Sequence, residues 1–219
     1  MRHSAGGSRP GFTLLELLVS IAVMVILASI LLPVVLLARR HARDATCKSN
    51  LTQLWKSTNI YAANYDKYLF VNHFPPLRIS NVVYKQGRPT GWGCLFPTYL
   101  PHYGVLFCPS DPVRDPAWTY GWQNWGTADG EVQCSYGYRG RHGFTTDPTC
   151  PLALGTVDGN PKKVFGVEYY EAFTAPARIH HTNHINLLRC NGQVEQSDLL
   201  VSFGPSEGEI DAALAALDR

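Results

Sequence analysis

Hydrophobic positions concentrate in one uninterrupted run near the amino terminus. Residues 12–38 hold a single charged side chain, Glu16, whereas the rest of the chain mixes polar, aromatic, glycine and proline positions. About 20 consecutive apolar residues suffice to cross a bilayer as a helix, and in lipid a helix satisfies its own backbone hydrogen bonds. The run therefore predicts a membrane-spanning helix. It is longer than the apolar core of a cleaved secretory signal, which has about 7–15 residues.

A second hydrophobic pattern continues the helix beyond this run. Residues 34–66 contain no glycine or proline. Apolar and small positions recur there at steps of three and four, as on one face of an amphipathic helix: Leu51, Leu54, Trp55, Thr58, Ala62 and Tyr65. We predict that residues 39–66 form an amphipathic continuation of the helix, and that this face packs under a globular head formed by residues 67–219.

The head has the pattern of a small antiparallel sheet with long loops. Residues 75–161 are dense in glycine, proline and aromatic residues, which favours loops and short strands. Residues 163–173 are rich in β-branched and aromatic positions typical of a strand. Asn191 and Gly192 separate two further apolar stretches, and Asn-Gly predicts a hairpin with a type I′ turn. We expect Ile185 and Leu187 to supply its buried face with Val194. The expected fold class is α+β, a long helix packed on the sheet.

Composition narrows the functional class. The chain has 219 residues, of which 16% are charged, and its net charge is +2. A nucleic-acid-binding protein usually presents a strongly basic face, and the sequence contains no phosphate-binding, dinucleotide-binding or nucleophile-elbow motif. We therefore predict no nucleic-acid partner, no cofactor and no enzymatic activity.

Six cysteines are present, and none forms a C-x-x-C pair that would indicate a zinc ribbon or a redox motif. An even number of cysteines in an exported chain is typical of disulfide-bonded proteins. We therefore predict disulfides in the loop-rich region, with the pairing open and buried thiols as the alternative. The candidates are Cys94, Cys108, Cys134 and Cys150.

Three further groups of residues raise site hypotheses, each weighed against a structural role. The first could bind a metal, although polar residues at a sheet edge are favoured: His180, His181, His184, Cys190 and Glu168. The second lies in loops and could supply oxygen ligands for calcium, without the spacing of an EF-hand: Asp111, Asp115 and Asp129. The third could stack on sugars or on a partner protein, although core packing is favoured: Trp118, Trp122 and Trp125. We predict no metal site.

The residues at the start of the apolar run read G-F-T-L-L-E, at positions 11–16. This string resembles the prepilin peptidase recognition motif of type IV pilins and type II secretion pseudopilins. The resemblance implies that residues 1–11 are a leader peptide, that the peptidase cuts after Gly11, and that Phe12 becomes the N-methylated first residue. It also implies that Glu16 and Pro33 serve assembly, at positions where the family carries an acidic residue and often a proline.

A second resemblance covers the rest of the chain. Residues 47–68, 106–111 and 135–138 are similar to segments of a bacterial prepilin-like group with a carboxy-terminal H-X9-DG signature. The signature itself corresponds to His181, nine intervening residues and then Asn191-Gly192, with asparagine in place of the usual aspartate.

These resemblances imply a structural subunit of a type IV pilus-like or type II secretion pseudopilus fibre. Its implied partners are prepilin peptidase, other pilin or pseudopilin subunits, the inner-membrane assembly platform and the membrane. The subunit would cross the inner membrane once, with its amino terminus cytoplasmic and its head periplasmic, before entering a periplasmic or extracellular fibre. The alternative is a periplasmic binding or sensing protein that uses a pilin-like anchor.

The distribution of basic residues opposes this topology. They lie on both sides of the span: Arg2 and Arg9 before it, and Arg39, Arg40, Arg43 and Lys48 after it. The excess after the span would retain the following domain in the cytoplasm by the positive-inside rule, but large domains translocate largely regardless of charge. We therefore retain the topology that the resemblance implies.

Overall fold

The computed structural model describes part of the chain. The described residues are 12–65, 69–70, 79–111, 120–139, 164–168, 184–198, 212, 215 and 216. The chain divides into two compact units, residues 1–42 and residues 43–219. One helix, α1 (Leu14–Asn64), contributes to both units, and its residues 43–64 are described below with the second unit.

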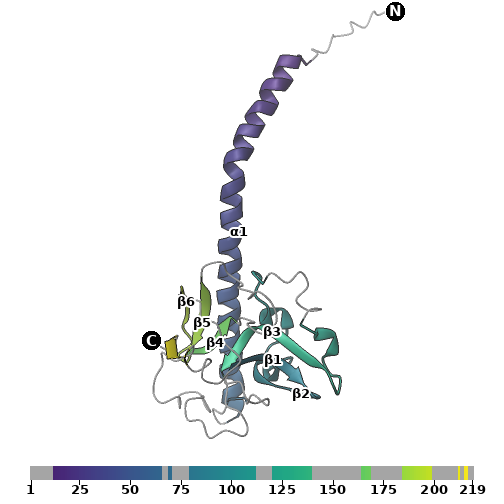
Figure 1. Cartoon of the computed structure of the whole chain (residues 1–219), viewed down its shortest axis with the longest axis vertical. Helices are drawn as coiled ribbons and strands as arrows, with labels where there is room; N and C mark the ends of the chain where they lie inside the picture. Colours follow the sequence, from purple (N-terminus) through teal and green to yellow (C-terminus); the bar gives the residue numbers. More distant parts are fainter. Residues whose placement is uncertain are drawn as a thin grey trace, which may run out of the picture. The chain divides into compact units, whose positions relative to one another are not determined.

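The second unit contains an antiparallel sheet of six strands in the order β2-β1-β3-β4-β5-β6 (Figure 1). The strands are β1 (Ile79–Lys85), β2 (Arg88–Pro89), β3 (Glu131–Arg139), β4 (Val164–Glu168), β5 (Ile185–Arg189) and β6 (Val194–Ser197). Among the described residues between β2 and β3 are three short 3-10 helices: η1 (Gly91–Leu95), η2 (Tyr103–Leu106) and η3 (Trp122–Asn124). The α+β prediction of a long helix with a small antiparallel sheet is confirmed.

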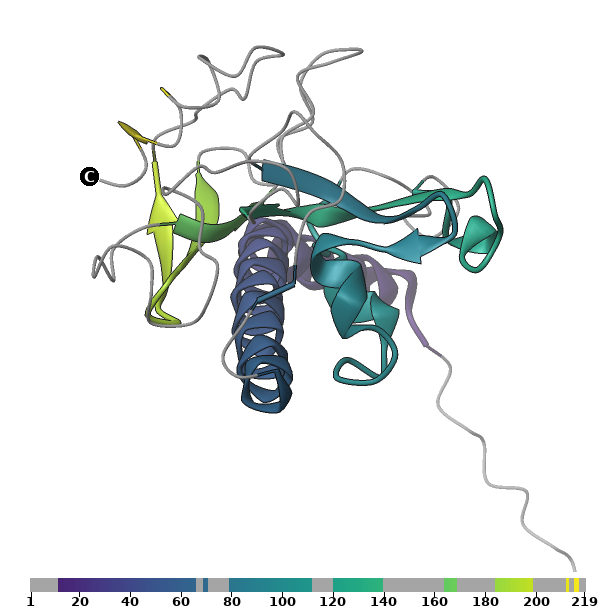
Figure 2. The same ribbon diagram turned by 90° about the horizontal axis from the view of Figure 1, so that it is seen from below.

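Residues 43–64 of α1 lie against one face of this sheet (Figure 2). The helix buries the face that its sequence pattern predicts, since Leu51, Leu54 and Thr58 have no exposed surface. Leu51 and Leu54 belong to one core cluster with residues of η1, η2 and β3. Tyr65 departs from the prediction, because the helix ends at Asn64 and the Tyr65 ring, half exposed, stacks on Tyr61 with 4.4 Å between ring centroids.

The β5–β6 hairpin forms where Asn191-Gly192 predicts it, but its turn differs from the predicted type. A type I′ turn needs positive φ at both central residues, and among the described non-glycine residues only Gln86 has positive φ. Instead, Gly192 donates a backbone hydrogen bond to the Arg189 carbonyl at 2.9 Å and adopts φ of 85°. The residues before Gly192 in the turn therefore have negative φ, and the positive φ falls on Gly192. This is the arrangement of a three-residue hairpin loop.

Ile185 and Leu187 of β5 are buried as predicted, but the strand also buries residues on its other face. Leu188 pairs directly with Val194, and these two side chains, rather than Ile185 and Leu187, pack in the cluster that contains the helix. Ile185 and Leu187 are buried as well, so β5 is covered on both faces. A strand that is covered on both faces shows no alternation from which its orientation can be predicted.

We predict that Leu54→Ala lowers the free energy of unfolding by about 2–5 kcal/mol, because it leaves a cavity in a packed core. Ile60→Ala is the matched control on the same helix, since Ile60 is 56% exposed whereas Leu54 is fully buried, and it should change stability by less than about 0.5 kcal/mol. Urea titration of the chain in detergent, followed by tryptophan fluorescence, measures both. Equal losses in the two variants would contradict the packing described here.

Candidate functional site

The first unit begins with a hydrogen-bonded cap at the start of α1. The Thr13 hydroxyl accepts a hydrogen bond from the Glu16 amide at 3.2 Å. In return, Glu16 Oε2 accepts hydrogen bonds from the Thr13 amide at 2.9 Å and from its hydroxyl at 2.8 Å. This reciprocal arrangement is a capping box, which satisfies amide groups at the helix start. The T-x-x-E pattern at residues 13–16 could have predicted it from the sequence.

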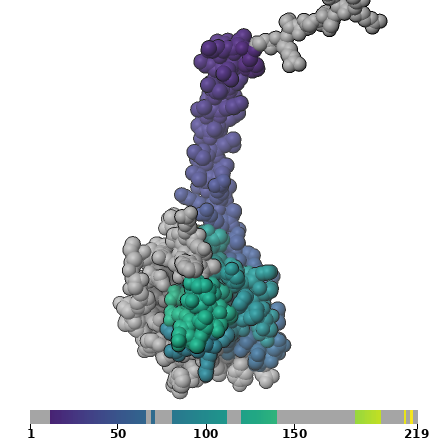
Figure 3. Space-filling view, turned by 90° about the vertical axis from the view of Figure 1, so that its right-hand side faces the viewer, coloured from purple at the N-terminus to yellow at the C-terminus, as the bar shows by residue number. Residues whose placement is uncertain are grey.

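Side chains of the apolar run have no covering surface within their own unit. The large hydrophobic residues between Phe12 and Leu37 are 43% to 81% exposed, and the space-filling view shows this segment bare on the face it presents (Figure 3). Exposed apolar surface of this extent marks an interaction with a membrane or with other proteins. Among the described residues, α1 is long and apolar enough to cross a membrane.

The polar groups within the run are satisfied by the helix itself. Ser20 and Ser29 donate their hydroxyls to the carbonyls of Glu16 and Ile26, each at 2.7 Å. Together with the capped Glu16, they are the polar side chains of residues 14–38. Pro33 lies inside α1 and supplies no amide hydrogen, which weakens the helix locally. The segment can therefore enter an apolar environment with few unsatisfied polar groups.

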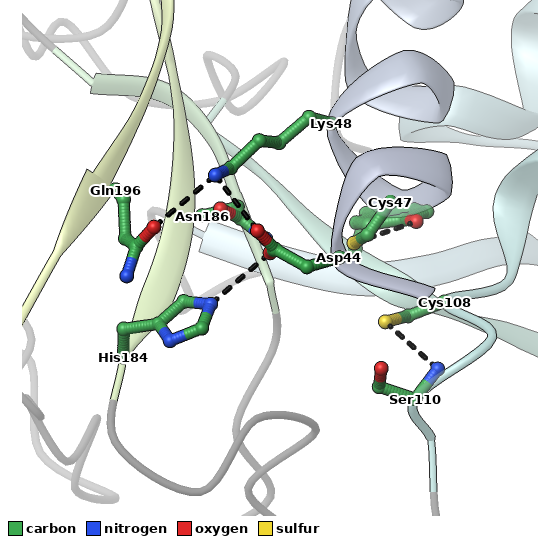
Figure 4. Close-up of polar contacts among 9 residues, drawn as sticks. Asp44, Cys47, Lys48, Cys108, Ser110, His184, Asn186 and Gln196 are labelled. Atoms are coloured by element: carbon green, nitrogen blue, oxygen red, sulfur yellow. Dashed lines mark hydrogen bonds and ion pairs between the residues drawn. The ribbon is translucent and has the colours of Figure 1, made fainter. Parts of the chain in front are cut away.

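In the second unit, α1 joins the β5–β6 hairpin through Asp44 (Figure 4). Asp44 Oδ1 accepts a hydrogen bond from Asn186 Nδ2 at 2.9 Å and lies 3.1 Å from His184 Nε2. Asp44 Oδ2 lies 2.8 Å from Lys48 Nζ, and Lys48 also donates to Gln196 Oε1 at 3.1 Å. Asp44 thus links the helix to β5 and the residue before it, and Lys48 links the same helix turn to β6.

Burial of the Asp44 carboxyl would by itself raise its pKa. The hydrogen bonds from Lys48, Asn186 and His184, with the charge of Lys48, outweigh burial and hold this pKa well below its usual range. Hydrogen bonding to the charged form of a carboxyl favours that form. Asp44 therefore remains ionised at neutral pH. No sequence motif could have predicted this contact, because His184 is 140 positions away along the chain.

Gly192 of the hairpin turn packs directly against α1. A Cβ atom added to Gly192 would lie 2.1 Å from Trp55 Nε1, so no side chain fits there, and its φ of 85° independently favours glycine. The neighbouring Asn191 accepts a hydrogen bond from the Gln193 amide at 2.9 Å through its Oδ1. An aspartate could accept the same bond, so the asparagine suits the turn. His181 lies outside the described residues.

The metal and calcium hypotheses gain no support from the described residues. No group of three His, Cys, Asp or Glu side chains suited to a metal occurs among them. His184 contacts Asp44 instead, while Asp111 Oδ2 accepts hydrogen bonds from the Tyr120 hydroxyl at 2.6 Å and the Ser135 hydroxyl at 2.9 Å. His180, the Glu168 side chain and Asp115 lie outside the described part.

Two of the three candidate tryptophans, Trp122 and Trp125, contact each other. The rings of Trp122 and Trp125 are stacked at 5.1 Å, and Trp122 Nε1 donates to the Gln133 carbonyl at 2.9 Å. Trp122 is buried in the core cluster, and Trp125 is partly buried against it. These contacts agree with core packing, and Trp118 lies outside the described residues.

The structure contains no disulfide at Cys94 or Cys134, and the disulfides expected in the exported protein stay a prediction. Both are free cysteines, and burial raises the pKa of each thiol to about 12. Cys134 donates to the Tyr136 carbonyl at 3.1 Å, which gives it a structural role in β3. Cys108 is buried, with its sulfur 3.4 Å from the Ser110 amide. Cys150 lies outside the described residues.

Part of the chain is similar to known proteins. Residues 8–32 match the model of the prokaryotic N-terminal methylation motif. The chain is also similar to the type IV wide pilus major component PilA4 of Thermus thermophilus, with 40% identity over 58 residues. That match spans 26% of this chain and 44% of the relative. No solved structure matches. Part of the chain is therefore similar to a type IV pilin, and residues 8–32, at the start of α1, carry the methylation motif.

We predict that Gly192→Ala destabilises the second unit through a clash with Trp55. Gly126→Ala is the matched control, because Gly126 has a similar φ of 87° but nothing within 4 Å of an added Cβ. Gly192→Ala should therefore cost about 1–3 kcal/mol more than Gly126→Ala, measured by thermal unfolding. In a Trp55→Ala background this difference should shrink. An unchanged difference would show that the contact with Trp55 is not its cause.

The depressed pKa of Asp44 predicts a specific acid sensitivity. A carboxyl whose folded pKa is lowered contributes stability that is fully present above its unfolded pKa, about 4, and is lost as pH falls below it. Asp44→Asn should cost about 1–3 kcal/mol at pH 7 and should flatten the loss of stability between pH 5 and pH 3. Asp129→Asn, which changes an exposed carboxylate, should retain the wild-type slope. Urea titrations across this pH range measure both slopes, and a wild-type slope in Asp44→Asn would contradict the assignment.

Proposed function

We propose that this chain is a structural subunit of a type IV pilus-like or type II secretion pseudopilus fibre. In this proposal prepilin peptidase removes residues 1–11 and α1 drives assembly. The observation that carries it is the apolar half of α1, whose large side chains are exposed and which coincides with the matched methylation motif. Removing one such side chain from water contributes about 1.5–3 kcal/mol. The helix is therefore stable in lipid before assembly and stable when packed against other apolar helices in the fibre.

Glu16 and the new amino terminus supply the specificity of this assembly. Cleavage after Gly11 exposes a cationic amine on Phe12, and methylation of that nitrogen keeps its charge. In an apolar fibre core, an isolated charge is costly and a matched pair is tolerated. The amine of one subunit paired with Glu16 of its neighbour therefore favours one axial register. The capping box of Thr13 and Glu16 satisfies the carboxylate while the subunit waits in the membrane.

The second unit supplies the outer part of the subunit. The proposed topology places residues 39–219 outside the cytoplasm, with residues 39–66 of α1 carrying the head. The buried face of α1 and the Asp44 contacts support this division, because they tie the helix to the sheet through packing and through charge. The proposed partners are prepilin peptidase, other pilin-like subunits and the inner-membrane assembly platform, and the proposed role is structural rather than catalytic.

Processing and assembly can be tested separately in the native organism. The mature protein should begin at Phe12 and carry one additional methyl group, measured by intact mass and by amino-terminal sequencing. Glu16→Val should leave cleavage intact but abolish recovery of the protein in sheared fibres, because the amine loses its partner. Ser20→Val, one turn further along the same helix, is the matched control and should assemble normally.

A different mature start would contradict the processing step. Normal recovery of Glu16→Val in fibres would contradict the role of the carboxylate. Unchanged localisation and no fibre association in both the wild type and Glu16→Val would favour the alternative, a pilin-anchored binding or sensing protein.

A further inference from the structure

Two cysteines lie at the same place in the fold, and only the second of them, Cys108, was among the disulfide candidates. Cys47 is on the buried face of α1, and Cys108 follows η2. Their exposed surface is 0% and 1%. Figure 4 shows both sulfurs turned toward the same space between α1 and the segment after η2. Both residues are in the thiol form in this structure.

A short series of contacts connects the two. Cys47 Sγ lies 3.2 Å from the Tyr136 hydroxyl. Asn50, one helix turn after Cys47, places its Nδ2 3.4 Å from that hydroxyl and donates to the Phe107 carbonyl at 2.9 Å. The Phe107 carbonyl belongs to the peptide group that joins Phe107 to Cys108. The hydrogen bond from Asn50 therefore fixes the backbone of Cys108 beside the helix turn that carries Cys47.

We infer that Cys47 and Cys108 form a disulfide in the exported protein, and that this bond covalently ties the assembly helix to the sheet-bearing part of the subunit. The inference uses one part of the proposed function, the placement of the second unit outside the cytoplasm, where disulfides persist. The bond would close the loop between residues 47 and 108, and cross-links across long loops constrain the unfolded chain most strongly. When a subunit is extracted from the membrane through its helix, this cross-link would keep the sheet-bearing part packed against the helix.

The chemistry balances with an external disulfide as the oxidant, either a protein disulfide oxidant or oxidised glutathione. One thiolate attacks a sulfur of that disulfide and displaces one thiol, and the second cysteine then displaces the other thiol from the mixed disulfide. The Cys47–Cys108 bond forms, the oxidant's bond breaks, two electrons pass to the oxidant, and its two sulfurs leave as thiols with the two protons. Because both sulfurs are buried in the folded chain, oxidation takes place during folding, before the loop closes on the helix.

Mass spectrometry without reduction tests the bond directly. Trypsin releases residues 44–48, which contain Cys47, and residues 86–114, which contain Cys94 and Cys108. These two peptides should be joined, at a mass lower by about 2 Da than their sum. The Cys94→Ser variant should retain the joined peptides, whereas Cys108→Ser should lose them. Loss of the joined species in Cys94→Ser, with retention in Cys108→Ser, would overturn the assignment.

Thermal unfolding supplies a second readout. A reductant should lower the unfolding midpoint of the wild type and of Cys94→Ser by about 10 °C. It should have no effect on Cys47→Ser, on Cys108→Ser or on the double variant, and the double variant should unfold at the same temperature as either single one. Additive losses in the double variant would show separate packing roles and would overturn the inference.

Two preparations distinguish this inference from the proposed function. The first is the full chain refolded in detergent with a glutathione redox buffer, in which the joined peptides should form wherever the cell places the head. Failure to form there overturns the inference and leaves the fibre proposal intact. The second is the protein from its native membrane. The disulfide could form in the refolded chain while both cysteines of the native protein react with an alkylating reagent. That result would overturn the disulfide in the native protein and, with it, the proposed topology.

Discussion

The fold depends on the burial of one face of α1 against the sheet. Leu51 and Leu54 place their side chains where η1, η2 and β3 converge, and no surface of either remains exposed. Apolar burial stabilises by about 25 cal/mol per Å² of area removed from water, so this face helps to hold the helix in the second unit. The other contacts of the helix adjust its position on the sheet.

Asp44 and Gly192 make that adjustment at two different points. The Asp44 carboxylate joins the helix to β5 through Asn186 and His184, so rotation of the helix would strand a charge. Gly192 brings the hairpin turn so close to Trp55 that a single added carbon would not fit. A charged contact and a steric contact therefore act together with the apolar face, and the same residues that hold the hairpin also orient the helix.

Sequence patterns predicted those features that depend on neighbouring residues. Leu51 and Leu54 were identified from helical spacing, and the β5–β6 hairpin from Asn191-Gly192. The turn type was wrong, because the contact between Gly192 and Trp55 involves residues far apart in the chain. Leu188 was missed as the helix-facing residue, since a strand buried on both faces has no alternation to interpret.

The features of the candidate site also separate into local ones, which the sequence could predict, and long-range ones, which it could not. The motif at residues 11–16 is local, and so is the capping box within it. The Asp44 contacts are long-range, so no spacing in the sequence could indicate them. The cysteine count could not indicate which thiols the fold brings close together, and Cys94 and Cys134 are free in this structure.

We propose that the bare apolar half of α1 is buried against other pilin-like subunits in the assembled fibre. A photo-crosslinking amino acid at Leu27, a side chain that is 56% exposed, tests it most directly in cells that carry fibres. The account predicts covalent dimers with another subunit, and their loss when Glu16→Val is introduced. Adducts with lipid alone, in fibre preparations that contain the protein, would contradict it.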